Sequence, residues 1–192
     1  MIIWVASYPK SGNTWVRSII SSLVYTEDGI FDFPSIKKID QYPQRRFLEY
    51  FTQDYNNIHE IKKHWITSQE RVNLDAKIKF FKTHHLNCKV DNYPFTNKGC
   101  TRATIYIVRD PRNLIDSISN HFSKSIEESK KFLLTSKILS PGKEIELRGG
   151  NVITYIGSWK EHYKFWTNDN ENLLIIKYLS LIHISEPTRR IT

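Results

Sequence analysis

Cysteine is scarce in this chain, and the two that occur, Cys88 and Cys100, form no CxxC pair. No histidines lie near them at zinc-finger spacing, which argues against a disulfide framework or a structural zinc site. No uninterrupted apolar run reaches the roughly 18 residues that a transmembrane helix needs, and no basic segment followed by a long apolar one opens the chain after Met1. We therefore expect a cytoplasmic protein without membrane insertion.

A glycine-rich nucleotide loop is missing as well. The Walker A pattern, GxxxxGK(S/T), has its lysine directly after the second glycine, whereas in the segment from Tyr8 to Thr14 the lysine, Lys10, precedes the only glycine, Gly12. This disfavours a P-loop kinase. That class stays an alternative because the strand, loop and helix plan is shared, and magnesium-dependent ATP turnover would support it.

Positive charge is in excess: 28 Lys and Arg against 20 Asp and Glu give a net charge of +8. Nucleic acid, acidic polysaccharide and a small phosphorylated cofactor would all suit this balance. A noncatalytic module for anionic polymers is therefore a second alternative, and it predicts salt-sensitive binding that is indifferent to Lys10. Because the basic residues are spread from Lys10 to Arg190, we expect no nucleic-acid partner.

Strand-like and helix-like segments alternate along the chain, which is long enough for one α/β domain. Apolar and β-branched runs predict strands at 2–7, 79–83, 103–108 and 173–177. Apolar residues at helical spacing predict helices after the first strand, from Pro111 onward, and over residues 153–166. Such alternation implies a mostly parallel sheet whose ligands bind beyond the carboxyl ends of the strands.

The segment from Tyr8 to Trp15 has the features of a phosphate-binding loop. Its backbone N–H groups and the start of the following helix can face an anion, while Lys10 adds positive charge. Ser11 and Thr14 add hydroxyl donors. Polar residues also follow the strands that end before His84 and before Arg109, so three polar clusters fall at the same edge of the predicted sheet.

Three ordered segments give a family resemblance. Residues 8–15, YPKSGNTW, resemble the YPKSGTTW loop of the sulfotransferases that use 3′-phosphoadenosine 5′-phosphosulfate (PAPS). Residues 81–84, FKTH, resemble the catalytic KTH segment of that family, and residues 107–117 resemble its 3′-phosphate-binding segment. A weaker match begins at Gly157-Ser158-Trp159, so the resemblance covers Ile2 to Tyr178. It implies an α/β fold, a P-loop-like three-layer sandwich with a central, mostly parallel sheet.

The resemblance implies a sulfotransferase that moves a sulfuryl group from PAPS to an acceptor hydroxyl or amine and leaves 3′,5′-diphosphoadenosine (PAP). Its motifs assign cofactor-binding roles residue by residue. The 5′-phosphosulfate would be held by Lys10, Ser11, Gly12, Asn13 and Thr14, adenine would stack on Trp15, and the 3′-phosphate would lie on Arg109 and Ser117.

The resemblance also selects His84 as the general base that takes the acceptor's proton. Lys10 and Lys82 would stabilise charge that develops on the leaving phosphate and the transferred group, so the resemblance requires no metal. His85 competes with His84, because adjacent residues of an extended segment point to opposite sides and the sequence does not show which imidazole faces the cleft.

One pattern is a decoy. The segment from His59 to His64 looks like a zincin helix, but its histidines are five residues apart instead of four and would diverge on a helix. A solvated amphipathic segment is the favoured interpretation.

The family pattern stops before the end of the chain. After Tyr178 we expect an acidic pair and, later, an Arg-Lys-Gly segment, whereas residues 179–192 match neither. We therefore interpret residues 1–178 as an incomplete sulfotransferase domain and residues 179–192 as a non-native tail, and we expect this truncated form to bind PAPS weakly. The acceptor would be a small molecule or glycan that the sequence does not identify. The sequence does not indicate the oligomeric state.

Overall fold

The structure is a computed structural model that describes residues 1–139, 152–168 and 171–178. The segment 179–192, predicted to be a non-native tail, lies outside the described residues. The described strands are β1 (Ile2–Ser7), β2 (Asp40–Gln41), β3 (Lys79–Thr83), β4 (Lys89–Val90), β5 (Tyr93–Pro94), β6 (Thr101–Val108), β7 (Ile138–Leu139), β8 (Thr154–Tyr155) and β9 (Leu173–Lys177).

The described helices are α1 (Asn13–Tyr25), α2 (Phe33–Ile36), α3 (Arg45–Leu48), α4 (Ile58–Ile61), η1 (Lys62–His64), α5 (Trp65–Val72), η2 (Pro111–Leu114), α6 (Ile115–Phe122), α7 (Ile126–Leu134) and α9 (Trp159–Thr167). The label η marks 3₁₀ helices. Among these elements, no helix is both long and apolar enough to cross a membrane.

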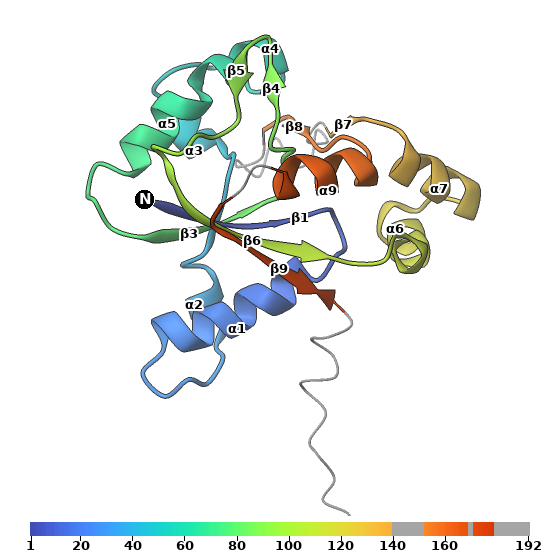
Figure 1. The fold of residues 1–192 in the computed structure, drawn as a ribbon, viewed down its shortest axis with the longest axis horizontal. Helices are drawn as coiled ribbons and strands as arrows, with labels where there is room; N and C mark the ends of the chain where they lie inside the picture. Colours follow the sequence, from blue (N-terminus) through green and yellow to red (C-terminus); the bar gives the residue numbers. More distant parts are fainter. Residues whose placement is uncertain (140–151, 169–170, 179–192) are drawn as a thin grey trace, which may run out of the picture.

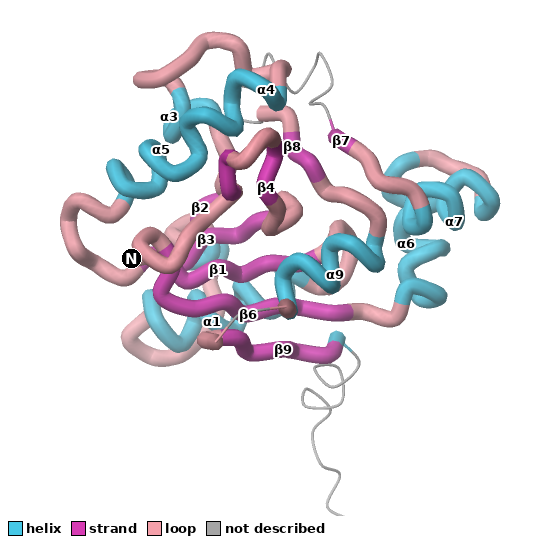
Figure 2. Tube along the Cα trace, turned by 45° about the horizontal axis from the view of Figure 1, so that its top comes forward, coloured by secondary structure: helices cyan, strands magenta, loops and turns pink. Residues whose placement is uncertain are grey.

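A five-stranded sheet forms the centre of the molecule, in the order β2-β3-β1-β6-β9 (Figure 2). All four strand pairs in it are parallel. The predicted parallel sheet is confirmed, and all four predicted strands belong to it. Because the strands are parallel, the segments that follow β1, β3 and β6 leave the sheet at the same edge, where ligands bind in open α/β folds.

Helices lie on both faces of this sheet, with α1 and α2 on one face and α3, α5 and α9 on the other (Figure 1). Alternate residues of β1 explain the two layers: Trp4 belongs to the core under α5 and α9, whereas Val5 packs with Val16 of α1. The three-layer α/β architecture predicted from the sequence is confirmed.

One helix differs from its sequence prediction, and another leaves part of its apolar face exposed. The helix predicted over 153–166 begins only at Trp159, because Ser158 and Glu161 form a capping box that starts it there. In α1 the apolar spacing correctly gives a helix, in which Ile19 and Leu23 are exposed. Apolar periodicity predicts that a helix has an apolar face, but not whether another element covers that face.

Candidate active site

The loop between β1 and α1 has an unusual backbone path. Lys10 and Gly12 both adopt the left-handed region, with φ of 68° and 95°. Such a conformation is easy for glycine and costly for lysine, and strained residues of this kind are enriched at functional sites. The loop therefore places Lys10 beside the amino terminus of α1.

That helix terminus is open to an anion. Gly12 is the residue before the first turn of α1. Because glycine has no side chain, no capping side chain accepts a hydrogen bond from the first backbone N–H groups of the helix. The positive end of the helix dipole adds to these donors. Thr14 and Trp15, in the first turn, are both exposed, and Trp15 keeps 45% of its surface accessible.

Lys82 and His84 come from the end of β3, the neighbour of β1. Lys82 Nζ donates to Gln41 Oε1 at 3.0 Å, and burial, together with the charge of Arg17, lowers the pKa of Lys82 to about 8. His84 Nδ1 lies 2.6 Å from the backbone oxygen of Ser7. A carbonyl oxygen only accepts, so Nδ1 carries the proton and Nε2 keeps a free lone pair.

Burial and, to a smaller extent, the positive charge of Lys82 together lower the pKa of His84 to about 3, against the opposing effect of the hydrogen bond to the Ser7 carbonyl. The imidazole is therefore neutral at pH 7 and able to accept a proton.

His85 lies in a different environment from His84. Its ring is completely buried, stacks on Phe95 at 4.2 Å and meets Trp65 edge to face. Its Nδ1–H donates to the backbone oxygen of Leu86 at 2.8 Å. The two adjacent histidines thus point to opposite sides, as expected for an extended segment, and His84 is the one that lines the cavity beside the loop.

Arg109 follows β6 and reaches back to the loop. Its Nη1 donates to the backbone oxygen of Lys10 at 3.1 Å, and its guanidinium lies 4.5 Å from the ring centre of Tyr178. Tyr178 also lies against Gly12, because a Cβ at Gly12 would fall 2.3 Å from its ring. Three parts of the chain therefore meet here: the end of β6, the residue after β9, and the loop between β1 and α1, which we call the phosphate-type loop.

Ser117 and His121 are four residues apart on α6 and line the same cavity. Residues at this spacing share one face of a helix. His121 did not emerge from the sequence, although its spacing from Ser117 would have indicated it. Tyr178 and Ser18 are further lining residues without a predicted role, and the position of Tyr178 at a strand end was the available signal.

One cavity of about 660 Å³ brings these groups together at the carboxyl ends of β1, β3 and β6. Of the residues predicted to act in cofactor binding or catalysis, all line it except Ser11, which is buried and whose Oγ has no hydrogen-bond partner among the described residues. Three cations and no carboxylate are among the lining residues, which are Lys10, Gly12, Asn13, Thr14, Trp15, Ser18, Lys82, His84, Arg109, Ser117, His121 and Tyr178.

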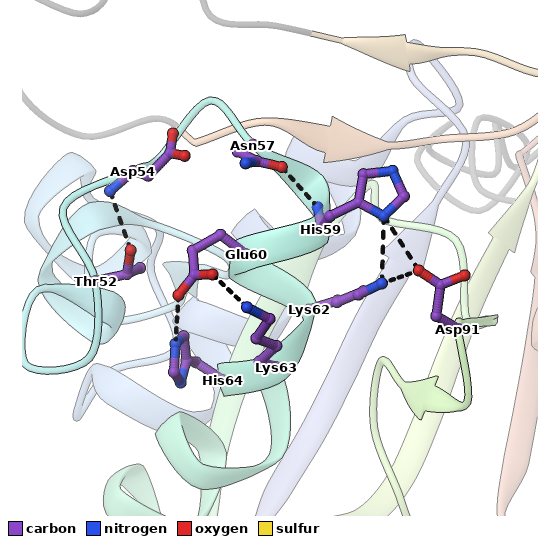
Figure 3. A network of polar contacts seen from close by, with 9 residues as sticks. All are labelled: Thr52, Asp54, Asn57, His59, Glu60, Lys62, Lys63, His64 and Asp91. Carbon is purple, nitrogen blue, oxygen red and sulfur yellow. Dashed lines mark hydrogen bonds and ion pairs between the residues drawn. The ribbon is translucent and has the colours of Figure 1, made fainter.

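The zincin-like segment forms a separate polar network on the surface (Figure 3). His59 Nδ1 lies 3.1 Å from Asp91 Oδ2, whereas His64 Nε2 lies 3.2 Å from Glu60 Oε1. The two histidines therefore face different partners. Within residues 1–139, 152–168 and 171–178, no group of three or more His, Cys, Asp or Glu side chains could hold a metal ion.

The fold and the cavity define an α/β protein with a positively charged cavity where β1 leads into α1. A sequence model of the sulfotransferase domain family matches residues 2–191, and the chain belongs to this family. Rat sulfotransferase 1E1 is 25% identical over 175 residues, which are 90% of this chain and 50% of that protein.

Two solved structures share the fold. Mouse sulfotransferase SULT7A1 in complex with PAP matches with a TM-score of 0.51 and 21% identity over 94% of this chain and 51% of the other. A retinol dehydratase in complex with retinol and PAP matches with a TM-score of 0.52 and 15% identity over 95% of this chain and 55% of the other. The chain therefore spans about half the length of the relatives it matches.

Proposed function

We propose that this chain carries the cofactor-binding and catalytic part of a PAPS-dependent sulfotransferase that acts on a hydroxyl or amine. The observation that supports this most is that Lys10, His84 and Arg109, from three different strand ends, line a single cavity. A cationic site without carboxylates suits a ligand with phosphate groups at two ends. When bound, PAPS supplies the sulfuryl group.

The residues present fit such a nucleotide. The first turn of α1 and Lys10 would hold the 5′-phosphosulfate, with Gly12, Asn13 and Thr14 contributing backbone N–H groups. Trp15, nearly half exposed, offers a face for adenine. Arg109 and Ser117 would hold the 3′-phosphate, and the guanidinium of Arg109 can donate to it while Nη1 stays on the backbone oxygen of Lys10. Ser11, whose buried Oγ has no hydrogen-bond partner among the described residues, would keep its predicted role at the 5′-phosphosulfate.

In the proposed mechanism His84 is the general base. The proton on Nδ1 is fixed by Ser7, so Nε2 is available to take the proton of the acceptor. A pKa near 3 makes the ring a weak base, but an anion bound at Lys82 would offset the charge that helps to hold this pKa down. Lys10 and Lys82 would stabilise the negative charge that grows on the leaving phosphate and the transferred group.

Residues 1–178 are proposed to be part of a larger domain, because the relatives are about twice as long and because Leu23 and Leu174 leave apolar surface exposed. We propose a small-molecule or glycan acceptor and a cytoplasmic location. We propose that the protein neither binds nucleic acid nor inserts into a membrane.

Titration calorimetry with PAP tests the proposal on the chain as it exists. We expect saturable binding that weakens by about tenfold or more in Lys10→Ala and in Arg109→Ala, because each removes a charged phosphate contact. The matched control is Lys98→Ala, which removes an exposed lysine that pairs with Glu171. This variant should bind PAP with the affinity of the unaltered chain. Equal PAP affinity in all three variants would refute the proposal, as would binding to anionic polymers that does not depend on Lys10.

A further inference from the structure

The side chain of Asn13 is committed to β1. Its Nδ2 donates to the backbone oxygen of Val5 at 2.9 Å and to Ser7 Oγ at 3.1 Å, and the residue is only 5% exposed. The amide group therefore points inward, although Asn13 is the first residue of α1 and lies in the phosphate-type loop. This leaves the backbone N–H of Asn13, but not its side-chain N–H groups, for an anion.

Ser7 connects this amide to His84. The residue is fully buried at the end of β1, and the parallel register pairs Ala6 with Thr83, so the next residues of the two segments, Ser7 and His84, lie side by side. Both oxygens of Ser7 approach the imidazole. His84 Nδ1 is 2.6 Å from the backbone oxygen and 3.3 Å from Oγ.

The directions of these hydrogen bonds follow from the chemistry of the groups. The carbonyl of Ser7 requires the proton to be on Nδ1, so Oγ accepts from that same N–H and also from the amide of Asn13. Three groups from α1, β1 and the end of β3 thereby form one chain. On the other side, His162 Nε2–H donates to the backbone oxygen of His84 at 3.2 Å, which helps to fix the backbone beneath the ring.

We infer that Ser7 and Asn13 are positioning residues for His84, with Asn13 acting through Ser7 to hold Nε2 toward the acceptor. The inference rests on the proposed function, in which His84 is the base. It gives Asn13 two separate tasks: its backbone N–H serves the anion, and its side chain serves the base. An anion bound to the backbone N–H of Asn13 would then influence the orientation of the imidazole through the side chain of the same residue.

Nitrogen NMR of the His84 ring tests this inference without turnover, with the signals assigned by their loss in His84→Gln. We expect a neutral ring protonated on Nδ1 at pH 7. In Ser7→Ala the exchange of that proton with water should become about tenfold faster, as the loss of one hydrogen bond predicts. Ser7→Thr keeps a hydroxyl and should restore the slow exchange. Ser21→Ala removes another fully buried hydroxyl, bonded to Ser18, and should change nothing at His84.

The same samples are titrated with PAP. Ser7→Ala should keep the affinity within about twofold, because Ser7 is not assigned to the anion. Asn13→Ala should change the His84 ring signals, because it removes the donor to Ser7 Oγ. An unchanged His84 signal in Ser7→Ala overturns the inference. So does an Asn13→Ala variant that binds PAP about tenfold more weakly while its His84 signals stay as they were, since that is the behaviour of a direct ligand. If the unaltered chain binds no PAP but its His84 ring responds to Ser7→Ala as described, the proposed function fails and the positioning role stands.

Discussion

The two faces of the central sheet are built very differently. Under α5 and α9 lies a dense aromatic core in which Trp4 contacts Tyr42, Phe95 and Trp166. Under α1, in the part of the chain that the structure describes, the core cluster has only three buried apolar residues, Val5, Val16 and Ile107. The outer side of α1 keeps apolar residues exposed, with Leu23 at 75%. The aromatic face thus provides most of the apolar burial, whereas the α1 face carries the loop that would bind the nucleotide.

This difference separates stability from function. A helix that presents its amino terminus to a ligand has to leave that end open, and α1 does so on the thinner layer. The aromatic core packs against β1, β3 and β6. Ser7, His84 and Arg109 lie at the ends of these well-packed strands. The contrast predicts unequal responses to mutation on the two faces.

The largest effect is expected on the aromatic face. Trp4→Ala should lower the free energy of unfolding by about 3–5 kcal/mol, because the ring is fully buried and its Nε1–H donates to Thr101. Val16→Ala removes two methyl groups from the α1 face and should cost only about 1–2 kcal/mol. Urea unfolding measures both, and equal losses would contradict the contrast.

The next largest effect is expected on how the free energy of unfolding depends on pH. Burial lowers the pKa of His85 to about 3 on the aromatic face, while the unfolded chain binds that proton near pH 6.5. Below pH 6.5 the unfolded state therefore holds more protons, and stability falls as pH drops toward 3, by about 1.4 kcal/mol per pH unit for one histidine. His85→Phe should flatten this slope by that amount, as measured by urea unfolding from pH 7 to pH 5.

A matched control for His85→Phe is Phe81→Leu, which alters a buried aromatic residue of the same core without a titratable group. It should leave the pH dependence of unfolding as it is. If both variants gave the same slope as the unaltered chain, burial of His85 would not be the cause of the acid sensitivity.

Much of this architecture could be predicted from the sequence. The strands at 2–7 and 79–83 are short apolar runs followed by polar residues, and a parallel sheet brings such ends to one edge. The pairing of Lys10 with His84 and Arg109 in one cavity followed from that rule and from the family motifs. The choice between His84 and His85 could not be made from residue types, because it depends on which side of the strand end the aromatic core occupies.

Other features depend on tertiary contacts that the sequence does not show. Asn13 replaces the threonine of the family motif, and the contacts of its amide with Val5 and Ser7 depend on how α1 packs against β1. The exposure of Leu23 likewise depends on what lies beside α1, not on the spacing of its apolar residues. The two-residue strand β2 lies in a segment whose prolines and aromatics indicate irregular structure.

Gly12 offers a smaller and more local test at the edge of the α1 face. Gly12→Ala should cost about 1–2 kcal/mol because its φ is 95°, and its Cβ would also overlap the ring of Tyr178. In a Tyr178→Ala background the steric part disappears, so the added cost of Gly12→Ala should become smaller. Thermal unfolding of the four proteins in this cycle measures the difference, and a cost that is independent of Tyr178 would contradict the contact.

The smallest effect is expected on the outer side of α1. Leu23→Lys should change the free energy of unfolding by less than about 0.5 kcal/mol, because the side chain is 75% exposed. Urea unfolding measures this change, with Ile118→Lys on the buried face of α6 as a control that should be strongly destabilised. A loss above about 1 kcal/mol in Leu23→Lys would mean that this surface is covered in solution.

The most direct test of the central claim is a crystal structure of the chain with PAP. We predict that the 5′-phosphate lies on the N–H groups of the first turn of α1 and that Trp15 contacts the adenine. The 3′-phosphate should lie between Arg109 and Ser117, with His84 Nε2 facing the 5′ end of the nucleotide. A nucleotide bound away from the cavity lined by Lys10, or one whose phosphates both avoid Arg109, would contradict this account.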